Sequence, residues 1–177
     1  AAKIYDIIRE TVTNPNDPAQ YELASKRIRE LVEATPMPKD IENAIRSAYE
    51  ELCKKLNMKD VFVAVRSSAT AEDLADASFA GQQETFLNVR GIDEVLLYAV
   101  KCWSSLFTPR AIFYRNEKGF AHEKVFISVG VQKMVNSRAA GVMFTLTPVT
   151  GDTCQIVIEG SHGLGEAVVS GSVTPDD

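Results

Sequence analysis

The sequence has little of what marks secreted, zinc-binding or membrane-spanning proteins. Its three cysteines lie far apart and form no CxxC pair, so neither a disulfide framework nor a cysteine-based zinc site is expected. No apolar run approaches the length of a membrane span, and no signal-peptide pattern opens the chain. These absences predict a soluble, cytoplasmic protein with reduced thiols and without a membrane partner.

Short motifs of common nucleotide-binding and hydrolytic enzymes are also missing. There is no Walker A pattern GxxxxGK[ST], and the Gly-Leu-Gly run at 163–165 is not a dinucleotide fingerprint. The patterns HExxH and GxSxG do not occur. A nucleotide site in this chain must therefore have another design.

The composition is that of a globular protein with an acidic balance. The 177 residues are 45% hydrophobic and 24% charged, which is typical of one ordinary domain or of two small lobes that share a core. The net charge of −5, from 24 acidic and 19 basic residues, disfavours nucleic acid as a partner. Because the chain begins at Ala1 without a methionine and stops at Asp177 without a tail, we expect a fragment of a longer protein.

The first 58 residues contain no glycine and show helical periodicity. Apolar residues at helical spacing predict one helix before Pro15, a second that ends near Thr35, and a third over about 40–56. Little in this part has the chemistry of a catalytic site, so we interpret it as a scaffold.

The rest of the chain, 59–177, combines strands with helices. Consecutive strands on short turns favour antiparallel pairing. The sequence therefore predicts an α+β fold in which a helical segment, 1–58, precedes a β-rich lobe, 59–177, with a mixed, largely antiparallel sheet flanked by helices. The expected strands are 61–65, 84–89, 125–132, 140–146 and 155–159, and the expected helices are 92–107 and a short one that Thr108 caps.

The stretch from Val61 to Val89 carries the strongest functional signal. An apolar run predicts a buried strand that ends on Arg66, whose planar guanidinium suits phosphate oxygens. Backbone N–H groups near Gly81 can approach a phosphate closely, because glycine has no Cβ. Together these features suggest a nucleotide phosphate site, although a surface or ion-paired arginine beside an ordinary connecting loop explains the chemistry equally well.

The run VAVRSSATAEDLADASFAGQQETFLNV, residues 63–89, resembles the signature of the phosphoenolpyruvate synthase and pyruvate phosphate dikinase family, in its ATP-grasp nucleotide-binding domain. GVMFTLTPVTG at 141–151 and GSHGLGEAVVSG at 160–171 are similar to further family runs. The resemblance implies an ATP-grasp-type lobe, a design that clamps ATP between two β-lobes. It is strong over 61–177 and loose over the helical front.

The resemblance also implies roles for individual residues. Arg66 would hold the ATP phosphates and is the expected catalytic residue. The expected cofactor-binding residues are Gly81, Gln82 and Gln83 in a loop over the β- and γ-phosphates, Gln132, Met134 and Val135 beside the adenine, Thr145 facing the nucleotide, and Glu166 at the ribose or another polar edge.

The two histidines are not expected to be catalytic. His162 stands where the family often carries an aromatic residue, and the family's phosphorylated histidine belongs to a separate domain. His122 follows a predicted helix, and we expect an exposed polar residue there.

The reaction that the resemblance implies is that of a phosphoenolpyruvate synthase. The β-phosphoryl group of ATP passes to a histidine and then to pyruvate, and AMP and phosphate leave. The expected partners are ATP and the phosphohistidine and acceptor-binding domains of the same full-length protein. The family's phosphate-binding lysine would precede residue 1, and its magnesium ligands would follow Asp177. We therefore expect Mg²⁺ to be needed but to bind outside this chain, and the fragment to be inactive alone.

Two alternatives remain open. Phenylphosphate synthase and rifampin phosphotransferase use the same nucleotide domain, but their acceptors are phenol and a rifamycin. A module of a different class would bind nucleotide without catalysis, and its full-length sequence would lack the magnesium ligands downstream.

Overall fold

The computed structural model describes residues 2–69, 73–74, 77–78 and 84–174. The chain divides into two compact units, Ala1–Met134 and Val135–Asp177, and each is described here by itself. The division that the sequence predicts, after residue 58, falls inside the first unit. No helix in the described part of the chain is long and apolar enough to cross a membrane.

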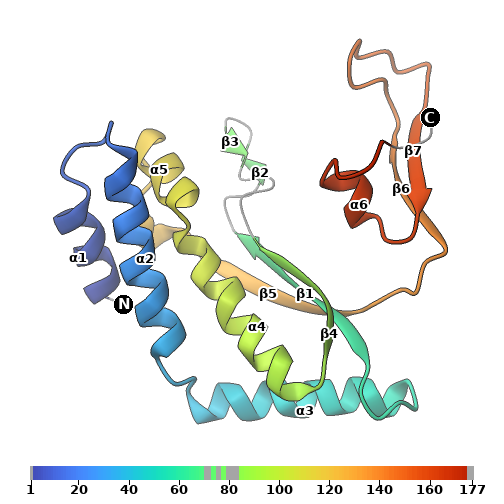
Figure 1. The fold of residues 1–177 in the computed structure, drawn as a ribbon, viewed down its shortest axis with the longest axis horizontal. Coiled ribbons are helices and arrows are strands. Elements are labelled where there is room, and N and C mark those ends of the chain that lie inside the picture. The colour runs from blue at the N-terminus through green and yellow to red at the C-terminus, as the bar shows by residue number, and fades with distance from the viewer. Residues whose placement is uncertain (1, 70–72, 75–76, 79–83, 175–177) are drawn as a thin grey trace. The chain divides into compact units, whose positions relative to one another are not determined.

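The first unit begins with three helices, and two more follow the strand at Thr85–Arg90 (Figure 1). Two helices start at a side-chain cap followed by proline. Asp17 accepts a hydrogen bond from the Ala19 amide at 3.0 Å, and Thr108 accepts one from the Ala111 amide at 3.3 Å, which confirms the cap predicted at Thr108. The helices are α1 (Ala2–Thr11), α2 (Pro18–Ala34), α3 (Lys39–Lys55), α4 (Ile92–Ser104) and α5 (Pro109–Glu117), with short 3₁₀ turns η1 (Ser105–Phe107) and η2 (His122–Lys124).

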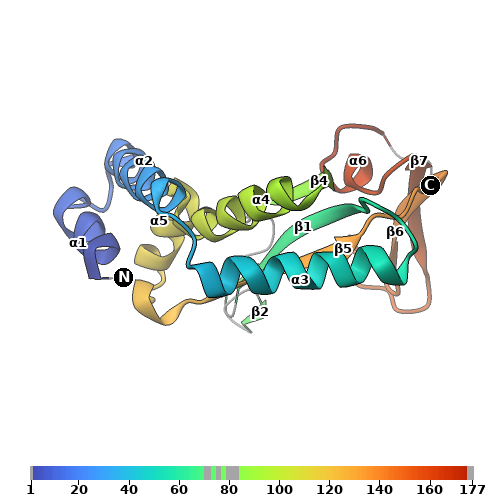
Figure 2. The same cartoon turned by 90° about the horizontal axis from the view of Figure 1, so that it is seen from below.

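The sheet of the first unit has three antiparallel strands in the order β4-β1-β5. They are β1 (Phe62–Ala69), β4 (Thr85–Arg90) and β5 (Ile127–Lys133), and a separate two-stranded pair joins β2 (Asp73–Leu74) to β3 (Ala77–Ser78). Helix α4 packs against all three strands of the larger sheet. Figure 2 shows α3 lying along the same strands.

The core of this unit lies between the sheet and its helices. Val63 and Val65 of β1 are fully buried and pack with Val95 and Cys102 of α4 and with Tyr49 of α3. Strand residues alternate between the two faces, so the same alternation that buries these valines turns their neighbours to the opposite face. A second apolar cluster joins α1, α2 and α5.

One boundary in this sheet differs from the prediction. The strand expected over 61–65 continues to Ala69, because Ser67, Ser68 and Ala69 remain paired with β5. Arg66 therefore lies inside a strand. A polar run that follows an apolar one favours a loop by its composition, but the pairing that keeps this run extended comes from β5, about 60 residues away in sequence.

The second unit contains the antiparallel strands β6 (Ala139–Phe144) and β7 (Val157–His162) and the short helix α6 (Glu166–Val169). Gly141 faces Gly160 across the pair, and a Cβ at position 141 would lie 2.2 Å from the Glu159 carbonyl oxygen. Only glycine allows this close backbone approach. Helices and antiparallel sheets in one chain confirm the predicted α+β class.

Candidate functional site

The face of the sheet opposite α4 is polar and largely open. Along β1 it carries Phe62, Ala64, Arg66 and Ser68, and all of these except Ala64 are exposed. The register places Gly130 opposite Arg66. We call this surface, formed by Phe62, Ala64, Arg66, Ser68, Ser128, Gly130 and Gln132, the open sheet face.

Arg66 and Gln132, both predicted site residues, meet on the open sheet face. The Arg66 Nη1 donates a hydrogen bond to the Gln132 Oε1 at 3.3 Å. Gln132 pairs with Ala64, so it is the diagonal neighbour of Arg66 across the two strands. This contact orients the guanidinium without neutralising it, because a side-chain amide carries no charge. In the part of the chain that the structure describes, no carboxylate pairs with Arg66.

Gly130 leaves space beside this arginine. A Cβ at position 130 would have only the Arg66 carbonyl oxygen within 4 Å, at 3.9 Å, which is an ordinary contact. The backbone therefore tolerates a side chain here, and its absence keeps the surface next to the guanidinium free. Sequence reasoning missed Gly130, since only the strand register shows that it faces Arg66.

A second cation lies at the other end of the open sheet face. The Arg90 guanidinium carbon is 5.1 Å from the centroid of the Phe62 ring, and Arg90 pairs with Phe62 across β4 and β1. A guanidinium over an aromatic face is weakly stabilised and keeps its charge. This residue too had no signal in the sequence, because it depends on cross-strand pairing.

Two of the residues expected beside the adenine, Met134 and Val135, follow directly after β5, and Met134 still pairs with β1. The Met134 amide donates to the Phe62 carbonyl at 2.8 Å, so this donor is already used within the protein. Val135 is 73% exposed, and its carbonyl accepts from the Ser137 amide at 2.9 Å. The Met134 N–H is therefore used within the protein, and the place of this segment beside the adenine stays a prediction.

Of the remaining predicted residues, two lie in the second unit and three cannot be placed. Thr145 is exposed in the bend that follows β6. Glu166 is exposed at the first position of α6, and its carbonyl accepts from the Ser170 amide at 2.8 Å. Gly81, Gln82 and Gln83 lie outside the described residues.

The prediction of an exposed His122 is wrong. This side chain is half-buried, and its Nδ1 accepts a hydrogen bond from the Nε of Arg115 at 2.9 Å. Burial, together with the positive charge of Arg115, lowers the pKa of His122 to about 4. Arg115 is only 1% exposed, so the two side chains form an interior contact that local sequence composition could not reveal. The other histidine, His162, is exposed at the end of β7.

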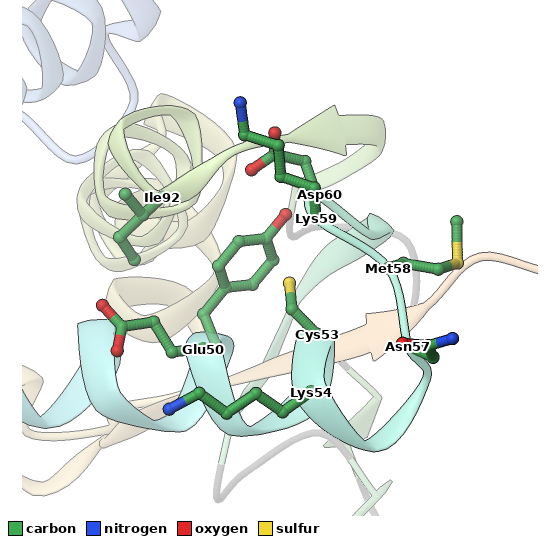
Figure 3. Close-up of a pocket in the computed structure, with 9 residues that line it drawn as sticks. Glu50, Cys53, Lys54, Asn57, Met58, Lys59, Asp60 and Ile92 are labelled. Carbon is green, nitrogen blue, oxygen red and sulfur yellow. The ribbon is translucent and has the colours of Figure 1, made fainter.

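A pocket of about 550 Å³ lies beside the C-terminal half of α3 (Figure 3). Cys53 and Lys54 line it from α3, and Lys59 and Asp60 line it from the segment that leads into β1. The Tyr49 hydroxyl at its wall donates to the Val61 carbonyl at 2.8 Å and accepts from the Gly91 amide at 3.0 Å. Its charged lining residues are of both signs, and none of the predicted site residues that the structure describes lines it.

The described residues do not provide a metal centre. No group of three or more His, Cys, Asp or Glu side chains among them could hold a metal ion. The residues on the open sheet face are cationic or neutral, and such groups suit an anion better than Mg²⁺.

Comparison with known proteins adds an independent finding. The family model described as "Pyruvate phosphate dikinase, AMP/ATP-binding domain" matches residues 1–177. The chain is 60% identical over 176 residues to the probable phosphoenolpyruvate synthase of Archaeoglobus fulgidus, which covers 99% of this chain and 23% of that protein. It is 52% identical over 174 residues to the phosphoenolpyruvate synthase of Pyrococcus furiosus, covering 98% of this chain and 21% of that protein. The chain thus spans about a fifth of the length of the curated relatives it matches.

Proposed function

The chain belongs to the family of pyruvate phosphate dikinase AMP/ATP-binding domains, and from this premise we propose that it is the ATP-binding part of a phosphoenolpyruvate synthase-like phosphotransferase. In the full-length protein, the β-phosphoryl group of ATP passes to a histidine on another domain and then to pyruvate. The names of the Archaeoglobus and Pyrococcus relatives support pyruvate as acceptor over phenol or a rifamycin.

The observation that carries this proposal is the state of Arg66. Its guanidinium is exposed on a rigid strand, held by a neutral amide at 3.3 Å, and unpaired with any carboxylate in the described residues. A guanidinium has five N–H donors, and Gln132 uses one of them. The remaining donors have the fork geometry that recognises phosphate oxygens in pairs.

The neighbouring residues support the same role. Gln132 limits the rotamers of Arg66, which lowers the entropy lost when a phosphate binds. Gly130 leaves room for the phosphate beside the guanidinium. A fixed cation next to a transferring phosphoryl group stabilises the negative charge that develops on its oxygens. Thr145 and Glu166, which are exposed in the second unit, stay proposed nucleotide contacts.

Mg²⁺ is the expected second cofactor, but the described residues do not fit it. No step of the mechanism is therefore assigned to a metal through this chain. The roles of Arg66, Gln132 and Gly130 are binding and orientation of phosphate, which do not depend on where a metal is held.

The test uses the full-length protein and two arginine variants. Arg66→Ala should raise the KM for ATP or lower kcat by about a hundredfold, in line with the loss of a cationic contact to a reacting phosphoryl group. Arg27→Ala is the matched control, because Arg27 is also exposed and also makes one hydrogen bond to a neutral side chain, to Thr11 at 3.4 Å. Normal ATP kinetics in the folded Arg66→Ala protein would remove the basis of the proposal.

A further inference from the structure

Glu84 is held from three directions at the start of β4. Its carboxylate accepts a hydrogen bond from the Arg29 Nη2 of α2 at 2.9 Å. Its backbone carbonyl accepts one from the Ser67 Oγ of β1 at 3.2 Å, and the Cys102 Sγ of α4 lies 3.7 Å from the same oxygen. One residue thus ties together α2, β1 and α4.

Arg29 is itself fixed before it reaches Glu84. Its Nε lies 3.7 Å from the Glu33 Oε1, one helical turn further along α2. That carboxylate oxygen in turn accepts a hydrogen bond from the fully buried Ser104 at 2.7 Å. The Arg29 and Glu84 side chains are 29% and 33% exposed, so water and salt screen their attraction less than that of a surface pair.

The position of this pair in the sheet gives it a consequence for Arg66. Thr85, the residue after Glu84, pairs directly with Arg66. The β1–β4 register shifts between Val63 and Val65, and among the described residues two pairs join the start of β4 to β1 on the Arg66 side of the shift. Such a short ladder fixes a strand end poorly, and an anchor from outside the sheet supplies what it lacks.

We propose that Arg29 and Glu84 form a positioning pair that fixes the start of β4 beside Arg66. This inference rests on the function proposed for Arg66, and neither residue of the pair touches ATP. The pair holds the backbone next to the phosphate-binding guanidinium. Its loss leaves the fold in place but lets the phosphate-binding groups move relative to one another.

The experiment measures steady-state kinetics of the full-length protein with Glu84→Gln. This change keeps the size and the backbone carbonyl of Glu84, removes its charge and replaces one acceptor oxygen by an NH₂ group. We expect the KM for ATP to rise by about tenfold, because a small misplacement of binding groups has effects of that order. The KM for pyruvate should not change, and the midpoint of thermal unfolding should shift by only a few degrees. A purely structural ion pair would not produce this split between the two substrates.

Two further variants serve as controls. Glu51→Gln removes an exposed ion pair of the same length, 2.9 Å to Lys55, and should leave the kinetics unchanged. The double variant R29Q/E84Q should impair the KM for ATP no more than Glu84→Gln alone does, since contacting residues are energetically coupled. If Glu84→Gln unfolds the protein, Arg29→Gln decides, and an unaltered KM for ATP in that folded variant overturns the inference.

The outcomes separate this inference from the proposed function. If Arg66→Ala impairs the ATP kinetics and Glu84→Gln does not, the positioning pair is overturned and the phosphate role of Arg66 stands. If the ATP kinetics of Arg66→Ala equal those of the wild type, the proposed function is overturned, and the positioning pair with it. A defect in Glu84→Gln that affects ATP and pyruvate equally also overturns the positioning pair.

Discussion

A side chain introduced at Gly130 should block nucleotide binding without harming the fold. Gly130→Val places three carbon atoms on the open sheet face, directly opposite Arg66. The structure allows the change, because the added Cβ would meet only the Arg66 carbonyl oxygen, at 3.9 Å. Valine also favours a strand over glycine, so the free energy of unfolding should stay the same or rise by about 0.5–1 kcal/mol.

The effect on ATP follows from the space that the new side chain fills. If a phosphate lies beside the guanidinium, valine must displace it or force Arg66 away from Gln132. Either result should weaken ATP binding at least about tenfold, which corresponds to about 1.4 kcal/mol. Binding of ATP to the full-length protein by calorimetry, together with thermal unfolding, measures both quantities.

A matched control exists in the second unit. Gly160 also lies in a strand, and a Cβ there would meet only the Ala140 carbonyl oxygen, at 3.8 Å. Gly160→Val should therefore fold and bind ATP like the wild type. Unchanged ATP affinity in a folded Gly130→Val protein would refute the idea that phosphates lie over this part of the sheet.

Two further predictions concern stability. Gly141→Ala should destabilise the β6–β7 pair by about 1–3 kcal/mol, because its Cβ would lie 2.2 Å from the Glu159 carbonyl oxygen and the backbone must shift. Hydrogen exchange of these strands measures the effect, and unchanged protection would contradict the prediction. The pKa of His122 is lowered to about 4 in the folded state, below its ordinary value of about 6.5. Between these pH values the unfolded chain binds more protons than the folded one, so the stability of the fold should decrease as the pH drops from about 6.5 to about 4. His122→Asn keeps an acceptor for Arg115 but does not titrate, so its unfolding midpoint should depend less on pH there, and equal pH dependence of the two proteins would contradict the burial of His122.

Local signals in the sequence were sufficient for several parts of the fold. Thr108 followed by Pro109 is a helix start that depends only on adjacent residues, and the structure has α5 begin there. The alternation around Val129 likewise predicted β5 within two residues of its bounds. The long apolar period after Gly91 predicted α4, which ends in a 3₁₀ turn at Ser105.

Parts that depend on distant pairing could not be read in the same way. The strand β1 extends past Arg66 because β5 pairs with its polar end. The strand expected at 155–159 lies at Val157–His162, since Gly160 and its neighbours are weak strand formers that β6 holds extended. The half-buried state of His122 depends on the interior Arg115 in the same way.

The candidate site shows the same limit. The affinity of Arg66 for phosphate was predicted from its residue type, whereas the role of Gln132 was implied by the resemblance. The two side chains meet in the structure, and both roles stay predictions. The space at Gly130 and the anchor at Glu84 follow from strand register and from a contact across 55 residues of sequence. No local pattern encodes either feature.

The most direct test of the central claim is a crystal structure of the full-length protein with a non-hydrolysable ATP analogue. The account predicts that at least one guanidinium nitrogen of Arg66 lies within hydrogen-bond distance, about 2.7–2.9 Å, of a phosphate oxygen of the analogue. An analogue bound elsewhere, with Arg66 paired to a carboxylate or contacting only Gln132, would contradict it.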